Sequence, residues 1–368
     1  MKQLFEKTKI NQMELKNRFV RSATWEGLAN PDDSYSEELT DLVVNLAKGQ
    51  VGLIINSAAY VSRSGKGNVR QLGIHDDQLI SDYKKMVEKV HHEGSKIILQ
   101  IAHSGARATT QLTNSKPFGP SSIEIEGVIS CREITVSEIS QIIKDFKDAA
   151  VRAKKADFDG VQLHAAHGTL LSQFLSPVFN KRTDKYGGSI QNRVRLILQI
   201  LSAIKSILGK EFIVMIKINS DDFTAGGFTQ SEMLEVATML ESNGIDAIEL
   251  SGGLGLKISR YTSSREGKIA SKEEEVYFRD AAKLYKKRIK VPLILVGGIR
   301  SFEVAKELVE KEQADYIALS RPLIREPGLI KRWRSSDTRK ATCISCNQCF
   351  IPTRSGEGLY CVPDKQKH

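Results

Sequence analysis

Eight short apolar runs, each followed by a segment of helical character, constrain the fold of this chain more than any other feature. Nearly all of the runs are continuous, as in parallel strands that are buried on both faces. They cover residues 19–23, 51–56, 96–101, 160–164, 212–218, 246–250, 292–296 and 316–320. Amphipathic segments separate them, among others at 36–49, 77–94, 136–156, 192–209, 229–244 and 301–313. This alternation predicts an α/β fold, a (β/α)8 TIM barrel.

A doubly wound sheet is the alternative fold. Such a sheet usually carries a glycine-rich phosphate loop after its first strand, and RSATWEGLAN at 21–30 is not one. After about residue 336 the sequence becomes rich in Cys, Gly and Pro and loses its periodicity. We therefore expect a barrel over residues 1–335 and a short Cys-rich C-terminal extension over residues 336–368.

Charge and hydropathy narrow the class of protein. The net charge is +10, but acids are interleaved with the basic residues and no nucleic-acid-binding motif is present, so anionic ligands explain the charge better. No apolar run is long enough to span a membrane, and MKQLFEKTKINQMELKNR lacks the apolar core of a signal peptide. We expect a cytoplasmic protein with a small-molecule substrate and no nucleic-acid or membrane partner. The sequence is compatible both with a monomer and with a homo-oligomer.

Polar residues and glycines follow several predicted strands, where TIM barrels hold their active sites. Gly297 and Gly298 follow the seventh strand and Arg321 follows the eighth, the usual place for a phosphate. The Gln100 amide can both donate and accept, as a flavin pyrimidine edge requires. The Lys217 cation could stabilise negative charge on a reduced flavin. The plainer interpretations are a glycine turn, a surface arginine, a satisfied amide and a lysine at the barrel rim.

Two histidines, His164 and His167, lie at the end of the fourth predicted strand. Two neutral imidazoles can donate hydrogen bonds to one carbonyl or anionic oxygen. Metal ligation and a structural pair are the alternatives, and metal is disfavoured because no third ligand follows at a zinc-like spacing. The pair is therefore a candidate site for binding a carbonyl or anionic oxygen atom of a ligand.

Four of the five cysteines form a C-x2-C-x2-C-x11-C series made of Cys343, Cys346, Cys349 and Cys361. Clustered cysteines in a chain without an export signal indicate metal binding rather than disulfides. The spacing favours a [4Fe–4S] cluster, and a zinc site and metal-free thiols are the alternatives.

The motifs together resemble the old yellow enzyme family of FMN-dependent oxidoreductases. QIAHSG, GVQLHAAHG, NKRTDKYGGS and VGGIRS occur in the family's order, and the resemblance covers nearly the whole chain. The cysteine series is similar to that of the branch with trimethylamine dehydrogenase and 2,4-dienoyl-CoA reductase, where it binds a [4Fe–4S] cluster.

The resemblance implies FMN in the barrel mouth and NADH or NADPH as the reductant. It implies that His164 and His167 bind the substrate carbonyl oxygen and that Gln100 holds the pyrimidine edge of the flavin. Lys217 takes the place of an arginine often found beside the flavin N1. The other flavin-binding residues that it implies are Ser22, Ala23, Thr24 and Ala58 at the ring and Gly297, Gly298, Ser320 and Arg321 at the phosphate.

One catalytic position departs from the family's pattern. Thr169 stands where many members have a tyrosine that protonates the substrate, and a threonine hydroxyl is a weaker and shorter acid. The resemblance implies an FMN-dependent NAD(P)H oxidoreductase that reduces the C=C bond of α,β-unsaturated carbonyl compounds. The alternatives are an amine or other dehydrogenase that passes electrons from FMN to a [4Fe–4S] cluster, and a non-enzymatic flavin electron carrier.

Overall fold

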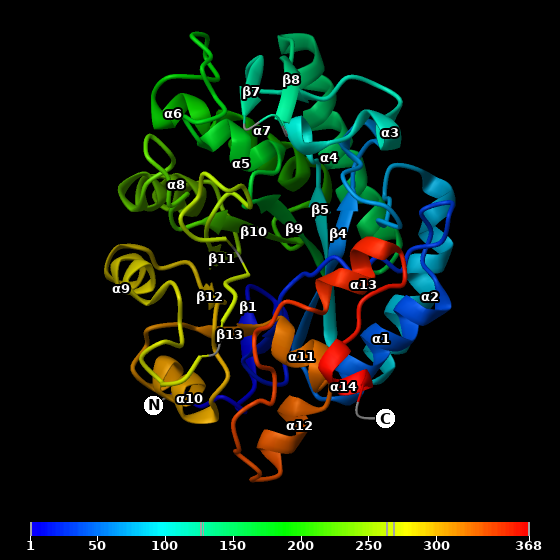
Figure 1. Ribbon diagram of the computed structural model, residues 1–368, viewed down its shortest axis with the longest axis vertical. Coiled ribbons are helices and arrows are strands. Elements are labelled where there is room, and N and C mark those ends of the chain that lie inside the picture. The colour runs from blue at the N-terminus through cyan, green and yellow to red at the C-terminus, as the bar shows by residue number, and fades with distance from the viewer. Residues whose placement is uncertain (1, 126, 128, 263, 268, 367–368) are drawn as a thin grey trace.

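Eight parallel strands close into a barrel in their order along the chain, and the last strand pairs with the first. This computed structural model describes residues 2–366 except residues 126, 128, 263 and 268. The strands are β3 (Phe19–Arg21), β4 (Leu53–Tyr60), β5 (Lys96–Ala102), β9 (Gly160–Ala165), β10 (Ile213–Asn219), β11 (Ala247–Ser251), β12 (Leu293–Leu295) and β13 (Tyr316–Leu319). All eight predicted strands are present, and the predicted TIM barrel is confirmed (Figure 1).

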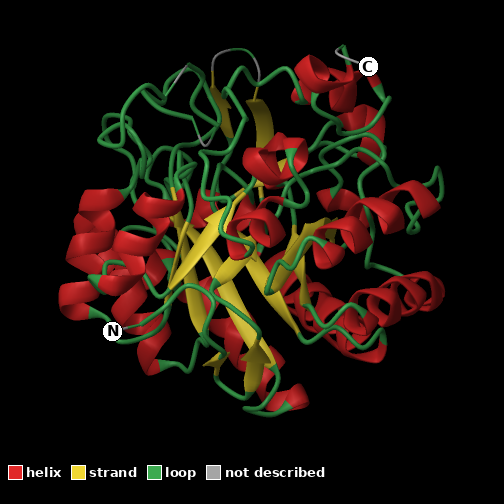
Figure 2. Ribbon diagram, turned by 90° about the horizontal axis from the view of Figure 1, so that it is seen from below, coloured by secondary structure: helices red, strands yellow, loops and turns green. Residues whose placement is uncertain are grey.

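Helices surround the strands, and their apolar faces pack on the outside of the barrel (Figure 2). The longer helices are α1 (Glu37–Lys48), α2 (Ile80–His92), α4 (Val136–Lys155), α7 (Arg195–Leu208), α8 (Gln230–Ser242), α9 (Arg279–Arg288) and α10 (Phe302–Glu310). Thr135 and Thr229 begin α4 and α8 with capping boxes, so these two helices start at the residue where the sequence provides a cap.

Two predicted helices differ in detail from the observed ones. The segment predicted at 77–94 opens with a 3-10 turn, η2 (Asp77–Leu79), before α2 begins. The segment predicted at 192–209 is divided at Val194, which separates α6 (Ile190–Arg193) from α7. In both cases the start of the helix is displaced and its buried face is kept.

A short antiparallel hairpin closes the amino-terminal end of the barrel. It consists of β1 (Thr8–Ile10) and β2 (Met13–Leu15). Its apolar side chains pack against interior residues near the starts of the barrel strands, such as Val20, Leu53 and Ile213. The opposite end, where the strands finish, carries the long loops, and TIM barrels hold their active sites at this end.

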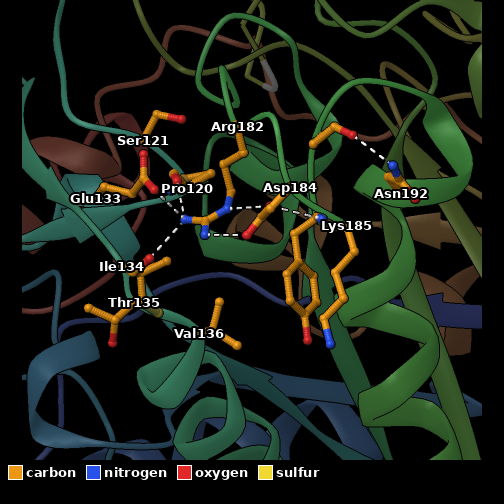
Figure 3. Close-up of polar contacts among 12 residues, drawn as sticks. Pro120, Ser121, Glu133, Ile134, Thr135, Val136, Arg182, Asp184, Lys185 and Asn192 are labelled. Carbon is orange, nitrogen blue, oxygen red and sulfur yellow. Dashed lines mark hydrogen bonds and ion pairs between the residues drawn. The ribbon is translucent and has the colours of Figure 1, made fainter.

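A three-stranded sheet stands in the connection between β5 and α4. Its strands are β6 (Phe118–Gly119), β7 (Ile123–Ile125) and β8 (Ile129–Glu133). The buried Arg182 donates to the carbonyl oxygens of Pro120 and Ile134 at 2.9 and 2.8 Å and pairs with Asp184 (Figure 3). The segment NKRTDKYGGS is therefore not a free polar loop, because its arginine fastens this sheet to the barrel.

The Cys-rich extension packs against the barrel through short helices. The extension contains α13 (Phe350–Ser355) and α14 (Val362–Lys365), and it follows directly on α11 (Arg321–Arg325) and α12 (Leu329–Arg334) of the barrel part. Ala341 of the extension belongs to the main hydrophobic core, together with Trp333 of α12 just before it, so the start of the extension is anchored by apolar contact. The remaining short elements are α3 (Thr110–Thr113), α5 (Leu170–Leu175), η1 (Arg63–Gly65) and η3 (Gly105–Arg107). In the described part of the chain, no helix has both the length and the apolar composition needed to cross a lipid bilayer.

Candidate active site

One cavity of about 380 Å³ opens at the carboxyl ends of the barrel strands. Its volume lies in the range of small-molecule and cofactor sites. Every residue that the sequence suggested for catalysis or flavin binding lines it, namely Ser22, Ala23, Thr24, Ala58, Gln100, His164, His167, Thr169, Lys217, Gly297, Gly298, Ser320 and Arg321. Residues distant in sequence meet here because parallel strands end at one rim.

A buried chain of hydrogen bonds lies inside the barrel beneath this cavity. Gln100 Nε2 donates to Gln162 Oε1 at 2.6 Å, and Gln162 Nε2 donates to Glu249 Oε2 at 2.9 Å. Ser22 donates to Glu249 Oε1 at 2.6 Å, and Lys217 Nζ lies 3.1 Å from the same oxygen. A carboxylate can only accept, so Gln162 must point its N–H group at Glu249, and its carbonyl oxygen then accepts from the N–H group of Gln100. The carbonyl oxygen of Gln100 is then left to accept from an N–H group of a ligand.

The two histidines meet in the cavity with their ring centroids 5.7 Å apart. Burial, with smaller contributions from His167 and Lys217, holds the pKa of His164 well below its ordinary value of 6.5. Burial, followed by Lys217, lowers the pKa of His167 to about 3. The buried Nδ1 of His164 has no hydrogen-bond partner among the described residues, whereas His167 Nδ1 lies 3.3 Å from the carbonyl oxygen of Gly253. Both rings are neutral at pH 7, and His164 is the freer of the two to bind a ligand.

The hydroxyl group of Thr169 is directed at the main chain. It donates to the carbonyl oxygens of His164 at 2.8 Å and of Ala166 at 3.0 Å. Thr169 also stands at the N-cap of α5 without a side-chain capping bond. Its proton therefore fastens the turn after β9, which carries His167, to the end of the strand, which carries His164, and is not aimed into the cavity.

The loops after β12 and β13 present donors suited to a phosphate group. Gly297 and Gly298 have φ values of 114° and 77°, which favour glycine, and a Cβ atom on either would meet Phe278 or Tyr277. The main-chain N–H groups of Gly298 and Ile299 have no acceptor among the residues that the structure describes. The Arg321 side chain lies beside them on the cavity wall. Main-chain donors with a nearby guanidinium group match a phosphate.

Several lining residues were not predicted. Arg300 follows the Gly-Gly pair, and Phe350 and Arg354 come from α13 of the Cys-rich extension. The arginine after VGGI could have been inferred from its position next to the proposed phosphate loop. Nothing in the aperiodic extension signals that Phe350 or Arg354 reaches the barrel mouth.

The four cysteines line a second, small pocket next to the cavity. In the part of the chain that the structure describes, no three His, Cys, Asp or Glu side chains are arranged to hold a metal ion. Burial, followed by Cys343, raises the pKa of the Cys349 thiol to about 11. Arg321 lines both pockets, and its Nη1 donates to Asn347, which lies between Cys346 and Cys349. The cysteine pocket and the cavity are therefore joined by the Arg321 side chain, which lines both.

The chain is similar to known oxidoreductases over nearly all of its length. Residues 3–339 match the NADH:flavin oxidoreductase / NADH oxidase family. NADH oxidase of Thermoanaerobacter brockii is 38% identical over 362 residues, which cover 97% of this chain and 54% of that protein. NADPH dehydrogenase of Clostridium acetobutylicum is 32% identical over 335 residues, which cover 89% of this chain and 93% of that protein.

A similar solved structure is that of 2-naphthoyl-CoA reductase in complex with 2-naphthoyl-CoA. It has a TM-score of 0.89 and 28% sequence identity, and the match covers 98% of this chain and 56% of that one. The chain thus spans about half the length of this reductase and of the Thermoanaerobacter NADH oxidase.

Proposed function

This chain belongs to the NADH:flavin oxidoreductase / NADH oxidase family, of the old yellow enzyme type, and we propose that it reduces the C=C bond of α,β-unsaturated carbonyl compounds with electrons from NADH or NADPH. The observation that carries the proposal is the pair of neutral histidines in the same cavity as Gln100 and Lys217, with the buried Glu249 beneath them. The family assignment supports a flavin and a nicotinamide nucleotide, and the carbonyl substrate follows from the histidines.

The residues around the cavity fit FMN. Gln100 would accept from the pyrimidine N–H, Lys217 would lie at the electron-rich edge of the ring, and the loops with Gly298 and Arg321 would hold the phosphate. FMN, when bound, would carry a hydride from the nucleotide to the alkene. The cavity supplies donors, and none of the described residues that line it is an acid that would repel a phosphate.

The histidines would bind the carbonyl oxygen of the substrate. Neutral imidazole N–H groups donate to this oxygen and stabilise the negative charge that develops on it when the alkene is reduced. Their depressed pKa values keep them neutral at physiological pH, so they act as fixed donors and do not supply the proton for the carbon atom. That proton must come from water or from another group.

An anaerobic titration tests the proposed reaction. We expect NADH or NADPH to bleach the visible flavin band of the purified protein and an enone to restore it. If neither nucleotide bleaches the band, the proposal is wrong. If an amine bleaches it and an enone does not restore it, the dehydrogenase alternative is favoured. A flavin band that no nucleotide, enone or amine changes would indicate an electron carrier.

Thr169→Tyr should increase the rate of enone reduction. A tyrosine hydroxyl is longer and more acidic, and a positioned acid accelerates proton transfer, so we expect at least a roughly tenfold gain. The rate is measured as enone-dependent reoxidation of the pre-reduced enzyme in a stopped-flow instrument. Thr169→Val is the matched control, because it removes the two bonds to the main chain without adding an acid. A tyrosine variant no faster than wild type would place proton delivery elsewhere.

We further propose that residues 336–368 form a cluster-binding extension of a barrel domain spanning residues 1–335. Four thiols around one pocket, with the Arg321 and Arg325 cations beside them, fit a negatively charged [4Fe–4S] centre. The cluster would supply one-electron transfer. Because Arg321 also lines the cavity, this position favours electron transfer between the two sites as a second candidate function.

Iron analysis tests the cluster. Protein purified and reconstituted without oxygen should hold about four irons per chain. Cys346→Ser should lower the iron content, whereas Cys131→Ser, which alters the buried cysteine of β8 outside the series, should leave it unchanged. Reconstituted protein without iron would contradict the proposal, and one zinc per chain would support the zinc alternative.

A further inference from the structure

Positive charge is in excess around the cavity. Five cationic side chains line it, and none of its described lining residues is acidic: the cations are Arg107, Lys217, Arg300, Arg321 and Arg354. Glu249 balances one of them from beneath, and the phosphate of a bound flavin would balance at most two more. The cavity therefore retains positive charge, which attracts a second anionic ligand.

Among the residues that the structure describes, Arg354 is the one lining cation without a partner. Lys217 pairs with Glu249, Arg107 donates to the carbonyl oxygen of His167, and the other two donate to residues of the Cys-rich extension, Ser345 and Asn347. The exposed side chain of Arg354 forms no hydrogen bond or ion pair with any residue that the structure describes. All the N–H groups of its guanidinium are therefore available to donate hydrogen bonds to a ligand.

The helix that carries Arg354 is held firmly in place. Thr353 is fully buried and packs on Gly27, where an added Cβ atom would lie 2.9 Å from the threonine methyl group. At the end of α13, Arg70 Nη1 donates to the carbonyl oxygen of Gly356 at 2.8 Å. Figure 1 shows α13, in red, in front of the barrel strands. The main chain of Arg354 is thus fixed at the cavity wall, which reduces the entropic cost of binding.

We propose that Arg354 binds an oxyanion, a carboxylate or a phosphate group, of an organic substrate of this enzyme. A guanidinium fork matches both groups through paired hydrogen bonds. The oxyanion belongs either to the alkene, as in an α,β-unsaturated acid, or to the nicotinamide nucleotide. The inference rests on the proposed function for the reaction, but the binding step can be measured without it.

Steady-state kinetics of Arg354→Gln tests the proposal. We expect the KM of an α,β-unsaturated acid to rise roughly ten- to a hundredfold, the loss of one charged hydrogen-bonded contact, and the KM of its methyl ester to stay within twofold. Arg354→Lys should recover part of the affinity for the acid. Arg288→Gln, an exposed arginine of α9 outside the cavity, should change neither constant.

The other outcomes distinguish the source of the oxyanion. A rise in the KM of NADH or NADPH alone would assign the contact to the nucleotide and still support the proposal. Unchanged constants for the acid, the ester and both nucleotides would overturn it.

A binding measurement separates the failure of this inference from a failure of the proposed function. If wild-type protein turns over none of these compounds, flavin-loaded protein is titrated with 3-phenylpropanoate and its methyl ester by calorimetry. Tighter binding of the acid than of the ester, lost in Arg354→Gln, would support the subsite. Equal affinities of the wild-type protein for the two compounds, together with unchanged affinities of Arg354→Gln for NADH and NADPH, would refute it.

Discussion

Glu249→Gln is expected to destabilise the protein by about 3 kcal/mol, because it leaves Lys217 as a buried cation without a counter-charge. The ammonium group has little access to water, and its remaining contact is with Ser22 at 2.8 Å. The lost stability is measured by urea denaturation. In flavin-loaded protein the unbalanced cation should also raise the reduction potential, by roughly 30 mV for each 1.4 kcal/mol of added stabilisation of the reduced form.

A second variant separates the charge effect from simple loss of packing. Glu249→Gln combined with Lys217→Met removes both charges, so most of the lost stability should return. The reduction potential of this double variant should fall below that of the single variant. An unchanged potential in the single variant would show that Glu249 has no electrostatic influence on the flavin. Loss of stability without recovery would indicate a packing role alone.

His164→Ala is expected to lower the rate of enone reduction roughly 100-fold, the usual cost of removing one donor to a developing oxyanion. His167→Ala should cost less, because His167 Nδ1 already faces the carbonyl oxygen of Gly253. Stopped-flow reoxidation of pre-reduced protein by an enone measures this step apart from reduction by the nucleotide. If His164→Ala keeps the wild-type rate, the proposed role of the histidines in enone reduction is wrong.

The pH dependence follows from the same burial. The pKa of His167 is lowered to about 3, so this ring stays neutral above pH 5. A plot of the rate of enone reduction against pH should therefore show no change near pH 6.5 from the titration of this histidine. Stability should behave differently. The unfolded chain binds protons below pH 6.5 that the folded histidines exclude, so stability should fall as pH decreases from 6.5.

The barrel could be predicted because its strands are continuous apolar runs, and each observed barrel strand overlaps one of them. The hairpin β1–β2 and the sheet β6–β8 could not, because strands of a few residues carry too little periodicity. Their positions depend on tertiary contacts, such as those of Arg182 with the carbonyl oxygens of Pro120 and Ile134.

The membership of the candidate site could be predicted better than its internal contacts. Strand ends placed the suggested residues around one cavity, because a parallel barrel brings those ends together. Gln162 and Glu249 were missed although a signal existed, since a polar residue within an apolar buried strand requires a partner. The direction of the Thr169 hydroxyl and the reach of Arg354 depend on local geometry that the sequence does not encode as a pattern.

The closed amino-terminal end of the barrel has a kinetic consequence for the proposed reaction. The β1–β2 hairpin fills that end, so the nucleotide and the alkene would both reach a bound flavin through the one cavity on the loop side, whose lining includes Phe350 and Arg354 of α13. Two ligands that occupy the same part of the cavity must bind one after the other. Initial rates should then give parallel lines in double-reciprocal plots, and a high concentration of either substrate should inhibit competitively against the other.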